Sequence, residues 1–143
     1  MTVALIHGPN LNLLGQREPA LYGSMTLEQL ESAVEEAALK LGLRLQTFQS
    51  NVEGDLVGIL QQVAPTCHAV IFNPGGFSHT SVAVRDAVAS LNIPTVEVHL
   101  THIHSREPFR RQSLTSQAAV ASISGLGLQG YFAALEHLRD LLH

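Results

Sequence analysis

The 143-residue sequence has little charge and only one cysteine. Charged residues make up 14% and apolar residues 45% of the chain, a balance that excludes an intrinsically disordered protein. Eight basic against twelve acidic residues leave a net charge of −4, which argues against a nucleic-acid-binding protein with a basic face. Cys67 has no partner for an internal disulfide, and this fits a reducing compartment.

Segments that direct a chain to a membrane are also missing. The apolar run at residues 3–6 has no basic residue before it and stops at Gly8-Pro9, so it does not resemble a signal peptide. No apolar run approaches the roughly 18 residues that a transmembrane helix needs. We therefore expect a cytoplasmic protein that folds as a single domain over residues 1–143.

Short apolar runs alternate with segments of helical periodicity along the chain. Strands are predicted over residues 3–6, 43–48, 69–72, 95–98 and 119–123. Thr26 with Gln29 and Ser50 with Glu53 fit capping boxes at helix starts, and Gly42 fits a helix end. The alternation predicts an α/β domain with a parallel sheet covered on both faces, and five such units favour the flavodoxin-like doubly wound topology.

Polar residues follow the predicted strands, at the edge of the sheet where this topology binds ligands. Turn formation and helix capping explain most polar residues at such positions, but His99 has neither preference. A functional site is therefore predicted at this edge. The polar residues there are Asn10, Asn12, Ser50, Asn51, Glu53, Asn73, His99 and Thr101.

Two other motifs have weaker interpretations. Residues 125–130 spell G-x-G-x-x-G, but the dinucleotide fingerprint also needs a further strand and an acidic residue about twenty positions on, so tight-turn glycines are favoured. His99, His102 and His104 with Glu97 could be metal ligands. Neither a second ligand pair nor an H-E-x-x-H helix accompanies them, so we favour general acid catalysis by one of the histidines.

Two single residues bear on covalent chemistry. Lys40 is the only lysine and therefore the only side chain able to form a Schiff base. It lies within a predicted helix and off its apolar stripe, which disfavours imine chemistry. Cys67 precedes the third strand, at the end of the sheet away from the site, and is predicted to be structural.

The segment after the first strand, GPNLNLLGQREPALYG at residues 8–23, is the most informative one. A single tyrosine in a loop usually packs its ring and leaves its hydroxyl in water. Tyr22 lies five residues after Arg17, at the predicted mouth of a polar site, and this favours a chemical role.

The whole of this segment resembles the signature of the type II 3-dehydroquinate dehydratases. Further matches follow in the same order from the first strand to the last helix, at residues 73–75, 79–81, 85–86, 97–100 and 106–110. The resemblance implies a flavodoxin-like lyase of the shikimate pathway, which converts 3-dehydroquinate to 3-dehydroshikimate by anti elimination through an enolate. It also implies no cofactor, no metal and no imine, and a homododecamer built from trimers.

The resemblance implies roles for individual residues as well. Tyr22 matches the base that takes the C2 proton, Arg17 the lid arginine that favours tyrosinate, and His99 the acid that protonates the departing C1 hydroxyl. Asn73 would hold a water against the enolate oxygen, and the matching aspartate, Asp86, would come from a neighbouring subunit. The matching substrate-binding positions are Asn73, His79, Asp86, Leu100, Thr101 and Arg110, with Asn10, Asn12 and Glu97 as further candidates.

Some positions depart from that pattern. Many members of the family have asparagine where this chain has His102, serine at Thr101, tyrosine at Phe77 and histidine at Val52. The bulkier, titratable His102 puts substrate affinity and its pH dependence in doubt, and leaves the reaction unaffected. The sequence leaves open whether the enzyme serves aromatic biosynthesis or quinate breakdown.

A binding module of the same fold for a nucleotide or phosphate, without catalysis, is the alternative. It would need a Gly- or Ser/Thr-rich phosphate loop after the first strand, where residues 11–14 are mostly leucine. A receiver-type signalling domain would need an aspartate in place of Asn73 and a lysine near the last strand, and neither is present.

Overall fold

The computed structural model describes all 143 residues and contains one sheet of five parallel strands. The strands follow the spatial order β2-β1-β3-β4-β5, and each neighbouring pair is parallel. This order is the flavodoxin-like doubly wound topology that the sequence predicts. The strands are β1 (Thr2–His7), β2 (Arg44–Gln49), β3 (Ala69–Asn73), β4 (Thr95–His99) and β5 (Ala121–Ser124).

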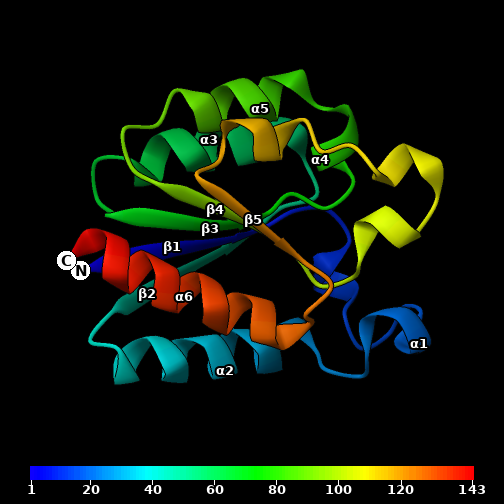
Figure 1. Ribbon diagram of the computed structural model, residues 1–143, viewed down its shortest axis with the longest axis horizontal. Helices are drawn as coiled ribbons and strands as arrows, with labels where there is room; N and C mark the ends of the chain where they lie inside the picture. The colour runs from blue at the N-terminus through cyan, green and yellow to red at the C-terminus, as the bar shows by residue number, and fades with distance from the viewer.

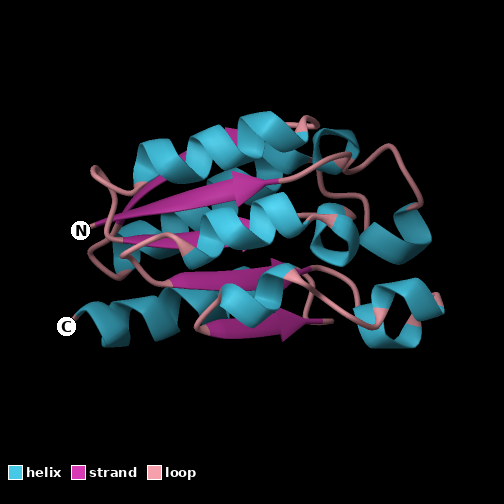
Figure 2. Ribbon diagram, turned by 90° about the horizontal axis from the view of Figure 1, so that it is seen from above, coloured by secondary structure: helices cyan, strands magenta, loops and turns pink.

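Helices cover both faces of the sheet (Figure 1). Helices α2 (Leu27–Lys40) and α6 (Leu128–Leu142) lie on one face, and α3 (Glu53–Val63) and α5 (Val82–Ala89) lie on the other. Short helical segments gather at the edge toward which the strand arrows point (Figure 2). These segments are η1 (Leu11–Leu13), α1 (Pro19–Tyr22), α4 (Phe77–Thr80), η2 (Ile103–Ser105) and η3 (Pro108–Arg110). A further short segment, η4 (Thr115–Ala118), packs against α5 before β5 begins.

Alternate side chains of β1, which lies between β2 and β3, pack into two separate cores. Val3 and Leu5 join the core formed with α2 and α6, whereas Ala4 and Ile6 join the core formed with α3 and α5. All four are completely buried, and a buried aliphatic side chain of leucine size contributes about 2 kcal/mol. Because both faces are covered, the strand is a continuous apolar run that ends where the polar edge begins.

The ends of α2 are those that the sequence predicts. Thr26 and Gln29 form a capping box, in which the Gln29 amide donates to Thr26 Oγ1 at 3.2 Å and Gln29 Oε1 accepts from the Thr26 amide at 3.0 Å. Gly42 follows the C-cap with a φ of 74°, the left-handed conformation that glycine adopts without strain.

The predicted capping box of Ser50 with Glu53 is wrong. Helix α3 begins at Glu53 with Val52 as N-cap, so Glu53 occupies the first helical position, where its side chain cannot reach back to the cap. The Ser50 hydroxyl instead donates to Asp55 Oδ2 at 2.9 Å and accepts from the Val52 amide at 3.0 Å. Ser50 therefore organises the turn before the helix.

Lys40 is the last residue of α2, whereas the sequence predicted a position in the middle of the helix. Its side chain is 74% exposed and pairs with Glu36 at 3.4 Å. Cys67 is buried before β3, as predicted. Gly125 and Gly127 have positive φ values of 88° and 57° in the β5–α6 connection, which confirms tight-turn glycines. None of the helices combines the length and apolar character that crossing a bilayer requires.

Candidate active site

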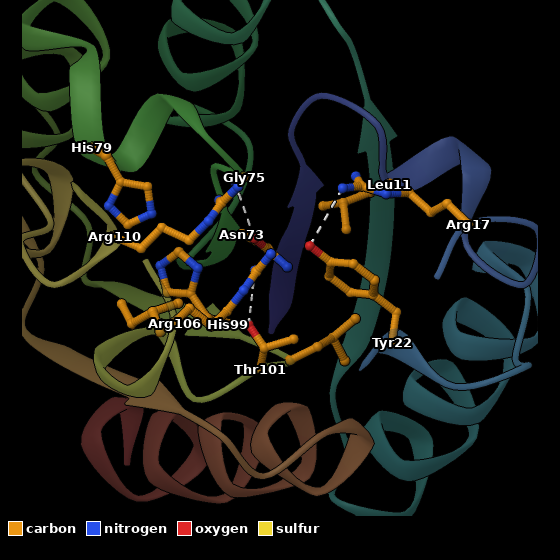
Figure 3. Close-up of a pocket in the computed structure, with 12 residues that line it drawn as sticks. Leu11, Arg17, Tyr22, Asn73, Gly75, His79, His99, Thr101, Arg106 and Arg110 are labelled. Atoms are coloured by element: carbon orange, nitrogen blue, oxygen red, sulfur yellow. Dashed lines mark hydrogen bonds between the residues drawn. The ribbon is translucent and has the colours of Figure 1, made fainter. Parts of the chain in front are cut away.

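A small pocket, partly open to solvent, lies at the carboxyl edge of the sheet (Figure 3). Three arginines and two histidines line it, and no carboxylate does, so the pocket favours an anionic ligand. Its walls come from the segments after β1, β3 and β4, as the topology predicts. The lining residues are Leu11, Arg17, Tyr22, Asn73, Gly75, His79, His99, Leu100, Thr101, Ile103, Arg106 and Arg110.

Tyr22 ends α1 and lies beside two guanidinium groups. Arg17 Nη2 donates to the Tyr22 hydroxyl at 3.4 Å, and the Arg17 Cζ atom lies 4.7 Å from the centre of the phenol ring. Arg106 Cζ lies 5.4 Å from the same ring centre. Negative charge on the phenol oxygen is therefore stabilised by two cations that belong to different segments of the chain.

His99 is the last residue of β4, and a buried carboxylate orients its ring. Glu97 Oε2 lies 2.8 Å from His99 Nε2. Glu97 is 1% exposed and also accepts hydrogen bonds from Ser113 Oγ at 2.6 Å and from Thr115 Oγ1. Because a carboxylate only accepts, His99 Nε2 carries the proton of this bond, and Nδ1 is left for a ligand.

His79 in α4 packs against His99, with ring centres 6.3 Å apart and ring planes at 23°. Its Nδ1 lies 2.7 Å from the carbonyl oxygen of Gln112. Burial lowers the pKa of His79, and the positive charges of His99 and Arg110 act in the same direction, whereas the Gln112 carbonyl opposes them. His79 is therefore neutral at neutral pH, with its proton on Nδ1 and Nε2 free to accept.

Asn73, the last residue of β3, is 4% exposed and has its side-chain amide held at both ends. Its Oδ1 accepts from the Gly75 amide at 3.1 Å, and its Nδ2 donates to the Tyr131 hydroxyl at 3.1 Å. Tyr131 lies in α6 and is completely buried. The amide plane of Asn73 is therefore fixed relative to the pocket.

The remaining polar residues lie on the segment after β4. Thr101 Oγ1 accepts from Arg106 Nη1 at 3.3 Å, and the Leu100 carbonyl accepts from the Gly127 amide at 3.0 Å. Arg110 Nε donates to Glu107, and this hydrogen bond holds the pKa of Glu107 below its usual value. Arg106 and Arg110 are thus held in place by hydrogen bonds to neighbours on their own segment.

Four of the residues matched to the family's site or offered as further candidates do not line this pocket, and neither do the polar residues after β2, namely Ser50, Asn51 and Glu53. Glu97 lies behind His99. Asp86 is on α5, with a 65% exposed side chain that accepts from Arg85 Nη1 at 3.2 Å. Asn10 is exposed and its backbone amide donates to Asn51 Oδ1, while Asn12 lines a separate hollow beside α2.

The structure adds Arg106, Leu11, Gly75 and Ile103 to the lining residues. Arg106 had a signal in the sequence, because it lies four residues before Arg110 within a matched motif. The lining leucine, glycine and isoleucine had none. His102 and His104 are exposed and lie edge to face, with ring centres 5.9 Å apart, outside the pocket. No group of three or more metal-ligating side chains comes together.

The fold and this pocket define a doubly wound α/β protein with acid–base side chains among arginines at its ligand-binding edge. The chain belongs to the class II dehydroquinase family, whose family model matches residues 1–139.

Relatives of similar length support the assignment to this family. A 3-dehydroquinate dehydratase from Pelotomaculum thermopropionicum is 50% identical over 135 residues, which cover 94% of each chain. Catabolic 3-dehydroquinase 2 from Neosartorya fischeri is 52% identical over 142 residues, which cover 99% of this chain and 95% of the relative. The crystal structure of a type II dehydroquinase from Butyrivibrio crossotus superposes with a TM-score of 0.94 at 36% identity and covers 96% of this chain and 97% of that one.

Proposed function

We propose that this chain is a 3-dehydroquinate dehydratase that removes water from 3-dehydroquinate to give 3-dehydroshikimate through an enolate. The observation that carries the proposal is the placement of the Arg17–Tyr22 pair and the His99–Glu97 pair around one cationic pocket. The substrate is a carboxylate, which suits a pocket lined by arginines. The full-length similarity to 3-dehydroquinate dehydratases supports the same activity.

Tyr22 acts as the base that takes the proton from C2 of the substrate. Ionising an ordinary phenol at neutral pH costs about 4 kcal/mol. A guanidinium in contact with the phenol oxygen stabilises the negative charge that the oxygen carries when it acts as a base. Arg17 has its guanidinium 3.4 Å from the oxygen, and Arg106 adds a second positive charge at the ring.

His99 acts as the acid that protonates the departing C1 hydroxyl. Figure 3 shows it across the pocket from Tyr22, which suits removal of the proton and of the hydroxyl from opposite faces. The C2 proton goes to the phenolate and the electron pair enters the C3 carbonyl as an enolate. Collapse of the enolate forms the C1–C2 double bond and expels the hydroxyl, which takes a proton from His99 Nδ1 and leaves as water, while the Nε2 proton stays on Glu97's side of the ring.

Asn73 stabilises the enolate, because it presents a fixed amide donor, directly or through a held water, where negative charge develops. Arg110, His79 and the Leu100–Thr101 segment bind the substrate carboxylate and hydroxyl groups. Glu97 acts from outside the pocket lining, where it orients His99. Asn10 and Asn12 lie outside the lining and have no contact that assigns them a step.

We further propose that the protein is cytoplasmic and assembles as a homododecamer built from four trimers. Asp86 lies off the pocket of its own chain and is largely exposed, which suits a contribution to a neighbouring subunit's site.

The proposed activity can be tested directly, because the C1–C2 double bond of the product is conjugated with its C3 carbonyl and absorbs in the ultraviolet. Purified protein mixed with 3-dehydroquinate should generate enone absorbance in the ultraviolet, with or without a chelator. A rate abolished by chelator and restored by zinc would contradict the metal-free mechanism.

The enolate route is separated from an imine route by borohydride. Lys40 is the only lysine and lies at the end of α2, away from the pocket. Borohydride with substrate should therefore leave activity and protein mass unchanged. A reduced adduct on Lys40 by mass spectrometry would contradict the enolate mechanism.

A further inference from the structure

Behind the pocket, on the face of the sheet covered by α2 and α6, lies a small group of buried polar side chains. Asn73 and His7 are neighbours in the β1–β3 register and both end their strands. Tyr131 reaches them from α6, with its ring centre 6.4 Å from that of His7. The proposed mechanism uses only the asparagine of this group.

Tyr131 is a costly residue at its position. It is completely buried in the core that contains Val3 and Leu5, where a phenylalanine would fill the same volume without taking a hydroxyl out of water. Burial raises the pKa of Tyr131 to about 12, so the hydroxyl is neutral at any working pH. Its one hydrogen bond to a protein side chain is the one it accepts from Asn73 Nδ2.

That hydrogen bond, together with Gly75, determines what Asn73 presents to the pocket. The Gly75 amide is a donor and therefore requires the oxygen of the Asn73 side chain on its own side. The Tyr131 hydroxyl then takes one of the two N–H groups of Nδ2. One N–H remains for a ligand. His7 does not compete for the amide, because neither of its ring nitrogens makes a hydrogen bond; its Nε2 lies 3.2 Å from Glu31 Oε1 without hydrogen-bond geometry.

From this geometry we infer that Tyr131 is a positioning residue for the reaction, which holds the Asn73 amide so that its second N–H points to the developing enolate oxygen. The inference rests on the proposed function of Asn73. A buried donor left without its acceptor would turn toward another partner, and a donor that has to reorganise loses most of its value to a transition state.

Tyr131→Phe removes the hydroxyl and keeps the ring in the core. We expect kcat/KM to fall about tenfold, the scale of one hydrogen bond that matters only in the transition state. The loss should appear in kcat, with KM changed by less than about twofold. Leu135→Val is the matched control, since Leu135 lies one turn further along α6 in the same core and should lower the melting temperature without changing kcat.

A double-mutant cycle separates positioning from a general effect on the fold. If Tyr131 acts through Asn73, Tyr131→Phe should cause no further loss of kcat in an Asn73→Ala background. If the double variant instead loses kcat by the product of the two single losses, the inference is overturned. Wild-type kcat in Tyr131→Phe, with kcat impaired in Asn73→Ala, would also overturn it. Wild-type kcat in Asn73→Ala would overturn it together with the proposed role of Asn73.

Should Tyr131→Phe fail to fold, the unaltered enzyme still tests the inference. Selective 15N labelling of asparagine allows exchange of the Asn73 side-chain protons with solvent to be followed. We expect one proton to be protected and the other to become protected only on binding a substrate analogue. Rapid exchange of both protons in the free enzyme would show that the Tyr131 hydrogen bond does not hold the amide.

Discussion

Tyr22 is a half-buried side chain whose hydroxyl contacts a guanidinium instead of the core. Removing that hydroxyl should therefore affect chemistry far more than folding. We expect Tyr22→Phe to lower kcat by about a hundredfold or more, the usual contribution of a general base, with an unchanged melting temperature. Steady-state kinetics and thermal unfolding measure the two quantities. A Tyr22→Phe enzyme with wild-type turnover would show that another group is the base.

The second cation at Tyr22 offers a comparison between two arginines on the same segment. Arg106 has a side chain that is 12% exposed and lies over the Tyr22 ring, whereas Arg111 is exposed and outside the pocket. Arg106→Leu should lower kcat by about tenfold or more, because charge stabilisation in a partly buried site amounts to at least about 1.4 kcal/mol. Arg111→Leu is the control with the same loss of charge. Equal kinetics for the two variants would remove Arg106 from the mechanism.

His79 provides a pH prediction for stability. Burial lowers its pKa in the folded protein, so the unfolded chain takes up this proton first as the pH falls. The fold therefore loses stability below about pH 6.5, the value of an unperturbed histidine, until the folded pKa is reached. His79→Asn should lose less unfolding free energy than wild type between pH 7 and 5, as measured by urea denaturation. If the unfolding free energies of the two proteins change in parallel with pH, the lowered pKa of His79 is contradicted.

At the scale of elements, the β5–α6 connection requires glycine at a defined position. Gly125 has a φ of 88°, and a Cβ there would lie 3.1 Å from the His102 Cβ. Gly125→Ala should destabilise the fold by about 1–2 kcal/mol, because of backbone strain and this contact. Gly58→Ala in helix α3 is the control, as a Cβ there meets nothing and alanine favours helix by about 1 kcal/mol. Chemical denaturation should show that Gly125→Ala lowers the free energy of unfolding and that Gly58→Ala raises it.

The regular elements could be predicted because their signals are local. Apolar runs of four to six residues mark strands buried on both faces, and the capping box of Thr26 with Gln29 needs only four consecutive residues. The Ser50 match shows the limit of this argument. The same residue types occur there, but the helix starts two residues later than the pattern implies, because Asp55 supplies the partner of the serine hydroxyl.

The short helices at the carboxyl edge were not predicted, since one helical turn has too few residues to show a period. Part of the site was missed for a different reason. Tyr131 fits the apolar stripe of its helix and is completely buried, so it is indistinguishable in the sequence from a packing residue. Its hydrogen bond to Asn73 joins residues 58 positions apart, so no local pattern could reveal it. Most other site residues were found through the family resemblance.

At the scale of the whole molecule, Asp86 poses a question that mixed subunits can answer. Asp86→Ala and Tyr22→Phe subunits should each be inactive. Because the proposed shared sites take each residue from a different chain, mixing the two should restore part of the wild-type activity. Labelled protein must first show that subunits exchange. If subunits exchange and no activity returns, Asp86 does not contribute to the site of a neighbouring subunit.

The distribution of amines gives the molecule a chemical polarity. Lys40 ends α2 at the side of the sheet where the strands begin, opposite the pocket (Figure 1). It carries the only side-chain primary amine in the sequence. An activated ester therefore modifies the side chains of each subunit only at the end opposite its pocket. Labelling or coupling by this chemistry leaves the substrate opening of each subunit unmodified.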